Sequence, residues 1–115
     1  MSERIYKLLR KSEWQEAEHT KLFAGSPDDC RDGFIHLSAA DQVRVTYAKY
    51  FASEAETMLI GFDIESFGPE LKWEASRNGA QFPHLYGPLD LSRAMSIAAI
   101  RRGADGAAVF PPEIS

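Results

Sequence analysis

Short apolar runs separated by turn-forming residues constrain this fold more than any other feature of the sequence. Each run is only a few residues long, which is typical of β-strands and far short of the roughly 20 apolar residues that a membrane-spanning helix needs. We therefore expect a chain rich in short strands, with no membrane segment. The runs are Ile5–Leu9, Phe34–Leu37, Met58–Ile64 and Met95–Ile100, with shorter extended segments at Leu71–Trp73 and His84–Tyr86.

Two helices are predicted, both in the N-terminal half: one over Glu13–His19 and a second that ends near Phe51. Each follows a capping-box pattern, in which a serine is followed three residues later by a side chain that reaches back to the serine amide. The two patterns are Ser12 with Gln15, and Ser38 with Asp41. Early helices followed by late short strands predict an α+β fold with a mostly antiparallel sheet rather than repeated βαβ units.

The 115 residues fit a single domain, 1–115. The segment Lys21–Gly33 is rich in Gly, Pro and Asp and predicts a long loop, of the kind that often forms a lid or a binding loop. Gly and Pro also recur after residue 101. We therefore expect a compact core over about residues 4–101 and an extended tail over 102–115.

Charge and cysteine content narrow the function classes. The net charge of −4 disfavours non-specific nucleic-acid binding, which depends on clustered Lys and Arg. The single cysteine, Cys30, excludes an internal disulfide, and Asp28 and Asp29 beside it disfavour a reactive thiolate. No apolar signal-peptide core follows Met1, so we expect a cytoplasmic protein.

Two segments, Phe34–Ser38 and Trp73–Tyr86, are predicted to line a polar ligand-binding or catalytic pocket. In the first, alternation along a strand turns Ile35 and Leu37 to the core and His36 and Ser38 to the other face. The predicted helix start at Ser38 would favour an anion. Equally, His36 could be a hydrogen-bonded residue beside a helix cap.

The second segment gathers aromatic, titratable and cationic side chains. Aromatic rings can stack on a flat ligand, and an arginine can grip phosphate through two parallel hydrogen bonds. His84 and Tyr86 alternate onto one strand face, as His36 and Ser38 do, so two histidines from different strands could transfer protons or bind an anion. An aromatic core around a rigid turn is the other interpretation. The remaining candidates in the segment are Trp73, Glu74, Ser76, Arg77 and Phe82.

Metal and serine-hydrolase chemistry are weaker interpretations. His36, His84 and Glu74 could supply three zinc ligands, but their spacing matches no compact metal motif, so we expect no metal. No Gly-x-Ser-x-Gly elbow or glycine-rich phosphate loop is present.

Several strings, in this order, resemble the family called domain of unknown function 952, over about Ile5–Phe110. They are Arg4–Lys7, Asp32–Ser38, Leu71–Glu74 and Phe82–Leu89. The family has no settled activity. More distantly, it is similar to the ADP-ribosyltransferase-like superfamily, which implies a split antiparallel sheet around a cleft for NAD. Members often carry a His or Arg on the first core strand; the matching position here holds Lys7.

Three hypotheses follow. The chain is an enzyme acting on NAD or a related nucleotide, a non-catalytic module that binds a small anionic metabolite, or a structural protein with these residues in its core. In the first, Arg77 and Ser38 hold phosphate, Trp73 or Tyr86 stacks on a ring, and a histidine orients a ribose hydroxyl or transfers a proton. We name His36, His84 and Tyr86 as candidate catalytic residues, and NAD as the one cofactor that the resemblance implies.

Overall fold

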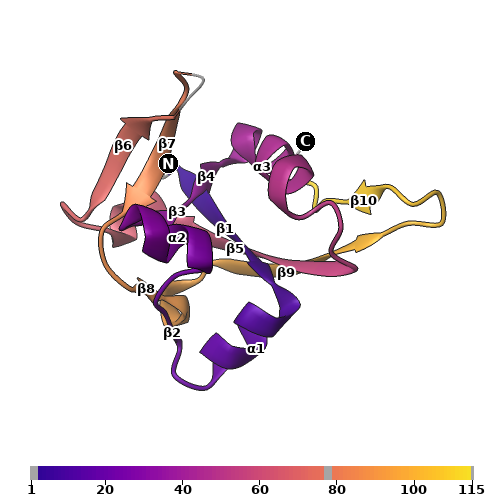
Figure 1. Ribbon diagram of the computed structural model, residues 1–115, viewed down its shortest axis with the longest axis horizontal. Coiled ribbons are helices and arrows are strands. Elements are labelled where there is room, and N and C mark those ends of the chain that lie inside the picture. Colours follow the sequence, from indigo (N-terminus) through magenta and orange to yellow (C-terminus); the bar gives the residue numbers. More distant parts are fainter. Residues whose placement is uncertain (1–2, 77–78, 115) are drawn as a thin grey trace.

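The computed structural model describes residues 3–76 and 79–114. Its largest sheet has five antiparallel strands in the order β10-β9-β5-β1-β4, with β1 near the centre (Figure 1). Strands far apart in the sequence pair in this sheet: β1 lies between β4 and β5, and β5 pairs with β9. The strands are β1 Arg4–Arg10, β4 Ser38–Ala39, β5 Glu56–Asp63, β9 Ser96–Arg102 and β10 Ala108–Val109.

The remaining strands form two smaller antiparallel sheets. One has the order β3-β7-β6, and the other pairs β2 with β8. The α+β class with mostly antiparallel sheets is therefore confirmed. The bounds are β2 Leu22–Phe23, β3 Ile35–His36, β6 Leu71–Ala75, β7 Gln81–Leu85 and β8 Leu89–Asp90, with single-turn 3-10 helices η1 Ala40–Gln42, η2 Ile64–Ser66 and η3 Leu91–Arg93.

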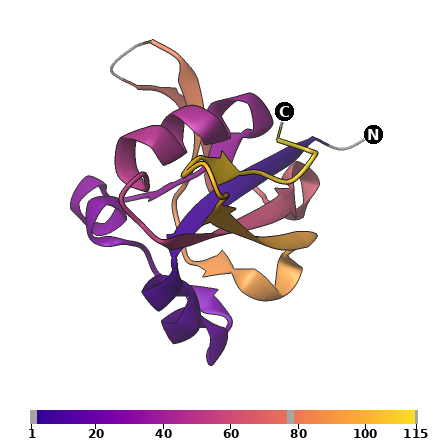
Figure 2. The same cartoon turned by 90° about the vertical axis from the view of Figure 1, so that its right-hand side faces the viewer.

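The core lies on both faces of the large sheet because side chains alternate along β1. Ile5 and Leu9 face one cluster, which includes Phe62, and Tyr6 and Leu8 face the other. The second cluster is covered by α3 (Val43–Tyr50) and the C-terminal segment, which lie on the same side of the sheet (Figure 2).

The first predicted helix is present, but it starts earlier than expected. Helix α1 spans Lys11–Glu18, and the residue before it is Arg10, whose amide donates to a Glu13 carboxylate oxygen at 2.9 Å. The predicted cap, Ser12, is inside the helix. A carboxylate in the first turn satisfies an orphan amide as well as a serine can, which is why the serine pattern misplaced the boundary.

The loop predicted over Lys21–Gly33 is wrong in both halves: the first contains strand β2, Leu22–Phe23, and the second forms helix α2 (Pro27–Asp32). Ser26 caps this helix: its hydroxyl accepts from the Asp29 amide at 3.2 Å, and the Asp29 carboxylate accepts from the Ser26 amide at 2.9 Å. Proline suits the first helical position, and Gly33 ends the helix with φ 86°, where glycine is favoured. The residues that suggested a loop are the signals of a short capped helix.

Ser38 is not a helix cap, which corrects the second capping prediction. The strand predicted over Phe34–Leu37 is shortened to β3, Ile35–His36, and β4 follows it at Ser38–Ala39 in a different sheet. The side chain that reaches back to a backbone amide is that of Gln42, which accepts from the Ala39 amide at 2.9 Å. Helix α3 begins one residue later, at Val43. The Ser38 hydroxyl is paired with the Thr46 hydroxyl at 3.1 Å.

The C-terminal segment, predicted as an extended tail, folds back onto the sheet. Strand β10 pairs with β9, and Ile114 is 1% exposed in the second core cluster. The Arg44 guanidinium lies over the Phe110 ring, 4.4 Å from its centroid, and donates to the Ile114 carbonyl at 3.0 Å. Gly103 and Gly106 lie in the reversal between β9 and β10, where the Gly103 amide donates to the Ala107 carbonyl at 2.8 Å.

Within residues 3–76 and 79–114, no helix has the length and apolar character needed to cross a membrane.

Candidate functional site

The pairing of β3 with β7 places His36 directly opposite His84. The two imidazole rings lie edge to face, with centroids 5.5 Å apart. Phe34 stacks on the His84 ring at 4.0 Å and lies 4.7 Å from the His36 ring. His36 and His84, distant in the sequence, therefore meet because β3 pairs with β7 of the β6–β7 hairpin.

The ring of His84 is hydrogen-bonded to the carboxylate of Glu74. Its Nδ1 lies 2.8 Å from Glu74 Oε1, and the Tyr86 hydroxyl donates to the same oxygen at 2.7 Å. These hydrogen bonds from Tyr86 and His84 lower the pKa of Glu74, and the bond to Glu74 raises the pKa of Tyr86. Glu74 therefore remains an ionised acceptor that fixes the His84 ring, whose side chain is 8% exposed.

His36 lies between two carboxylates of α2. Its Nδ1 is 2.6 Å from Asp29 Oδ1, and its Nε2 is 3.0 Å from Asp32 Oδ2. The His36 backbone amide also donates to Asp29 Oδ1, at 3.1 Å. The histidine thus links helix α2 to strand β3 through both ring nitrogens.

Asp29 is the centre of this network. It is 2% exposed and accepts from Lys7 Nζ at 3.0 Å, in addition to His36 and the Ser26 amide. Burial would raise the pKa of the Asp29 carboxyl, but the His36 bond, the Lys7 charge and the backbone amides hold it well below its usual range. A buried carboxylate that receives this many donors stays ionised.

Lys7 is the cation at the base of the network. It points from β1 and is 6% exposed, and its Nζ donates to the His36 carbonyl at 2.9 Å as well as to Asp29. Burial lowers the pKa of Lys7, and the adjacent Asp29 carboxylate opposes that effect. A buried lysine needs such a partner, because an isolated ammonium in the interior is strongly destabilising.

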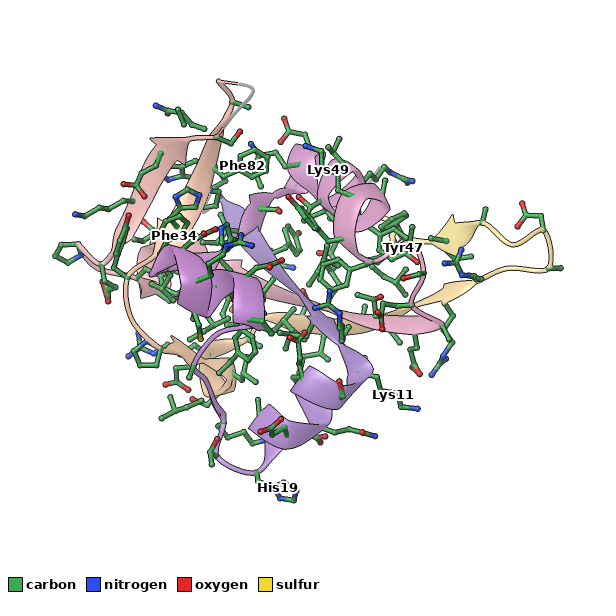
Figure 3. All side chains as sticks on the ribbon, viewed as in Figure 1. Lys11, His19, Phe34, Tyr47, Lys49 and Phe82 are labelled. Carbon is green, nitrogen blue, oxygen red and sulfur yellow. The ribbon has the colours of Figure 1, made fainter. Side chains whose placement is uncertain are left out.

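The two histidines line one cleft of about 340 Å³. Its walls are β1, α2, α3 and the β6–β7 hairpin; Figure 3 shows Phe82 on the hairpin and Lys49 on α3. The walls are mixed: Val45 and Tyr50 are apolar and more than half exposed, whereas most charged residues pair with one another. Among the described residues, Lys49 is a lining cation with no ion-pair partner.

The predicted site residues separate into four groups. His36, Ser38, Ser76, Phe82 and His84 line the cleft. Glu74 is hydrogen-bonded to His84 and to Tyr86, and neither Glu74 nor Tyr86 lines the cleft. Trp73 pairs with Pro83 and so lies on the opposite face of the hairpin from Phe82 and His84; it is not placed to stack on a ligand in the cleft. Arg77 lies outside the described residues.

Sequence reasoning missed the residues that α2 and α3 contribute. Asp29 and Lys7 were not candidates, although Ser26 and Asp29 have the spacing of a capping box, which would have predicted α2. Val45, Lys49 and Tyr50 carried no local signal, because a helix does not show which neighbouring hairpin its exposed face will meet. Within the described residues, no group of three or more His, Cys, Asp or Glu is arranged to hold a metal ion.

Comparison with known proteins supplies the family and the fold. The crystal structure of protein CC0527 from Caulobacter crescentus is 46% identical, with a TM-score of 0.85 over 92% of this chain and 93% of that one. The solution NMR structure of CC0527 is 48% identical, with a TM-score of 0.79 over 90% and 89% of the two chains. No curated protein matches. The model of the family described as "Protein of unknown function (DUF952)" matches residues 8–97, and the chain therefore belongs to this family.

Proposed function

We propose that the cleft binds a nucleotide-class ligand, such as NAD or a part of it, and that the chain acts on or holds this ligand at the wall that the paired histidines build. One observation carries the proposal: two imidazoles, each held at Nδ1 by a carboxylate, line the same cleft. A carboxylate on one ring nitrogen orients the imidazole and sets its tautomer, and this arrangement recurs where histidines bind ligands or move protons.

The walls support a ligand that is part ring and part anion. Val45, Tyr50 and Phe82 offer apolar surface for a flat ring, and Lys49 is free to meet a phosphate. The volume of about 340 Å³ is at the low end of small-molecule pockets, which span roughly 300–1,000 Å³. A mononucleotide suits this space better than a whole dinucleotide, part of which would extend outside.

The environment of Lys7 bears on transferase chemistry. The ADP-ribosyltransferase-like resemblance implies that a cation on the first core strand holds the ligand. Lys7 is instead committed to Asp29 and to the His36 carbonyl. We therefore keep nucleotide binding as the proposal and leave the reaction to product analysis.

Non-catalytic binding is the second candidate, favoured by the lack of an activated nucleophile among the described lining residues. The Ser38 hydroxyl is bound to Thr46, and Ser76 has no histidine partner among the described residues. In this case the same contacts hold a small anionic metabolite and release it unchanged.

Calorimetric titration with adenosine, AMP, ADP-ribose and NAD tests the proposal, with chromatography of each mixture afterwards. We expect AMP to bind more tightly than adenosine. Lys49→Ala should reduce that difference by up to about fivefold, the usual limit for an exposed charge pair. Lys11→Ala, outside the cleft, is the matched control and should change nothing.

His84→Gln should weaken all four ligands, whereas His19→Gln should weaken none, because His19 lies at the far end of α1 and does not line the cleft (Figure 3). Consumed ligand indicates an enzyme, and ligand recovered unchanged indicates a binding module. No heat with any of the four at millimolar concentration contradicts the proposal.

A further inference from the structure

The two histidines of the cleft differ in what they can offer a ligand. Both ring nitrogens of His36 face carboxylate oxygens, at 2.6 Å and 3.0 Å. Asp29 Oδ1 is hydrogen-bonded to Nδ1, and the Asp32 carboxylate occupies the position next to Nε2. His36 then has no ring nitrogen left for a ligand.

His84 has one nitrogen bound and one free. Glu74 takes Nδ1 at 2.8 Å, and no described residue is hydrogen-bonded to Nε2. The side chain is more than nine-tenths buried and lines the cleft, whereas Glu74 does not line it. Since Glu74 occupies Nδ1, Nε2 is the ring nitrogen left for a ligand in the cleft.

The Glu74 carboxylate determines which ring nitrogen of His84 carries the hydrogen. The Tyr86 hydroxyl donates to the oxygen that contacts Nδ1, so this oxygen is an acceptor for both groups. The same two hydrogen bonds lower the pKa of Glu74, which keeps the carboxylate ionised. Nδ1 must then carry the hydrogen, and in the neutral ring Nε2 presents a lone pair.

We propose that His84 Nε2 is the hydrogen-bond acceptor of the cleft and takes a hydroxyl of the ligand, such as a ribose hydroxyl, while His36 is a positioning residue that ties α2 to β3. An acceptor repels a fully ionised phosphate, so the anionic part of the ligand lies elsewhere in the cleft. This inference rests on the proposed function, because it assigns one group of the same ligand.

Long-range ¹H–¹⁵N correlation spectra of the histidine side chains test the assignment, because they show which ring nitrogen carries hydrogen. The chain has three histidines, so the signals can be assigned by single substitution. We expect a hydrogen on Nδ1 and none on Nε2 for His84, and a hydrogen on Nδ1 for His36, next to Asp29. Adenosine should shift His84 Nε2, and inorganic phosphate, the probe for an anion, should not.

Two variants separate the role of the carboxylate from that of the tyrosine. Glu74→Ala should release His84 to exchange between its two tautomers and weaken adenosine about tenfold, the value of one hydrogen bond. Tyr86→Phe keeps the Glu74 contact and should leave the hydrogen of His84 on Nδ1. A merely structural Glu74 would alter stability without changing the tautomer.

The outcomes distinguish this inference from the proposed function. A hydrogen on Nε2 of His84 in the wild-type chain, or a shift of that nitrogen by phosphate alone, overturns the inference and leaves nucleotide binding standing. If neither adenosine nor phosphate shifts His84 and no nucleotide binds by calorimetry, both fail together. If nucleotides bind without shifting Nε2, only the assignment of His84 is wrong.

Discussion

Asp29 receives hydrogen bonds from side chains and backbone of three separate elements, and it balances the buried charge of Lys7. Replacing it removes the charged partner of the Lys7 ammonium, which is 6% exposed. We expect Asp29→Asn to lower the free energy of unfolding by about 3–5 kcal/mol, as for other broken buried pairs. Urea denaturation measures this loss.

Asp28→Asn is the matched control for that substitution. Asp28 lies next to Asp29 on α2, but it is exposed and paired only with Arg31. Asp28→Asn should lower the free energy of unfolding by no more than about 0.5 kcal/mol. Equal losses in the two variants would contradict the central role of Asp29.

The same carboxylate should give the stability a dependence on pH. The pKa of Asp29 is lower in the folded chain than its ordinary value of 3.8, because of His36, Lys7 and the backbone amides despite burial. A lowered pKa stabilises the fold above the unfolded value, and that contribution declines as the pH falls. The difference in unfolding free energy between wild type and Asp29→Asn should therefore be full at roughly pH 6 and shrink below about pH 4. A difference that grows on acidification would contradict the account.

Individual residues show where sequence reasoning succeeds. Alternation along short strands, a local property of the chain, identifies His36 and His84, and Phe82 is a candidate as an aromatic residue of the second segment. Lys7 enters only through the superfamily resemblance, and Asp29 and Lys49 not at all, because a buried ion pair and a free cation become visible only when distant elements meet. Trp73 was placed on the wrong side because the sequence did not show which strand face the cleft would use.

Helix α2 is the element that brings two carboxylates to His36, and its start depends on Ser26. Ser26→Ala should lower the free energy of unfolding by about 1 kcal/mol, since an N-cap hydroxyl is worth roughly 0.5–2 kcal/mol. Thermal or urea unfolding checks the value.

Ser12→Ala provides the control, because Ser12 matches the same capping pattern but lies inside α1. Its substitution should change the free energy of unfolding by less than about 0.5 kcal/mol. If Ser12→Ala is the more costly change, the cap assignments are reversed.

At this scale the sequence predicted strands better than helix boundaries. Buried strands such as β5 are signalled by uninterrupted apolar runs, whereas α2 consists almost wholly of residues that also make turns. The placement of the neighbouring short strands β3 and β4 in different sheets has no local signal, because it depends on what β7 and β1 offer as partners.

Across the whole molecule, the C-terminal segment closes the second core cluster. Ile114 is buried against it, so Ile114→Ala should lower the free energy of unfolding by about 2–5 kcal/mol. Ile97→Ala deletes the same atoms from a side chain that is 52% exposed, and should cost clearly less. Similar losses would mean that the segment does not pack as described.

Class and strand content follow from the sequence, but the arrangement does not. The α+β class could be predicted from the order of helical and extended segments. The pairing of β1 with β4 and β5, and of β9 with the C-terminal β10, joins segments that share no sequence signal. The cleft between α2, α3 and the β6–β7 hairpin is a product of that arrangement.

The most direct test of the account is an NMR titration of the three histidine rings with AMP. His36 and His84 line one cleft, so their ring signals should shift together and saturate with one dissociation constant, while His19 stays unchanged. Shifts at His19 alone, separate saturation of His36 and His84, or no shift of either at millimolar AMP would contradict a shared nucleotide-binding cleft.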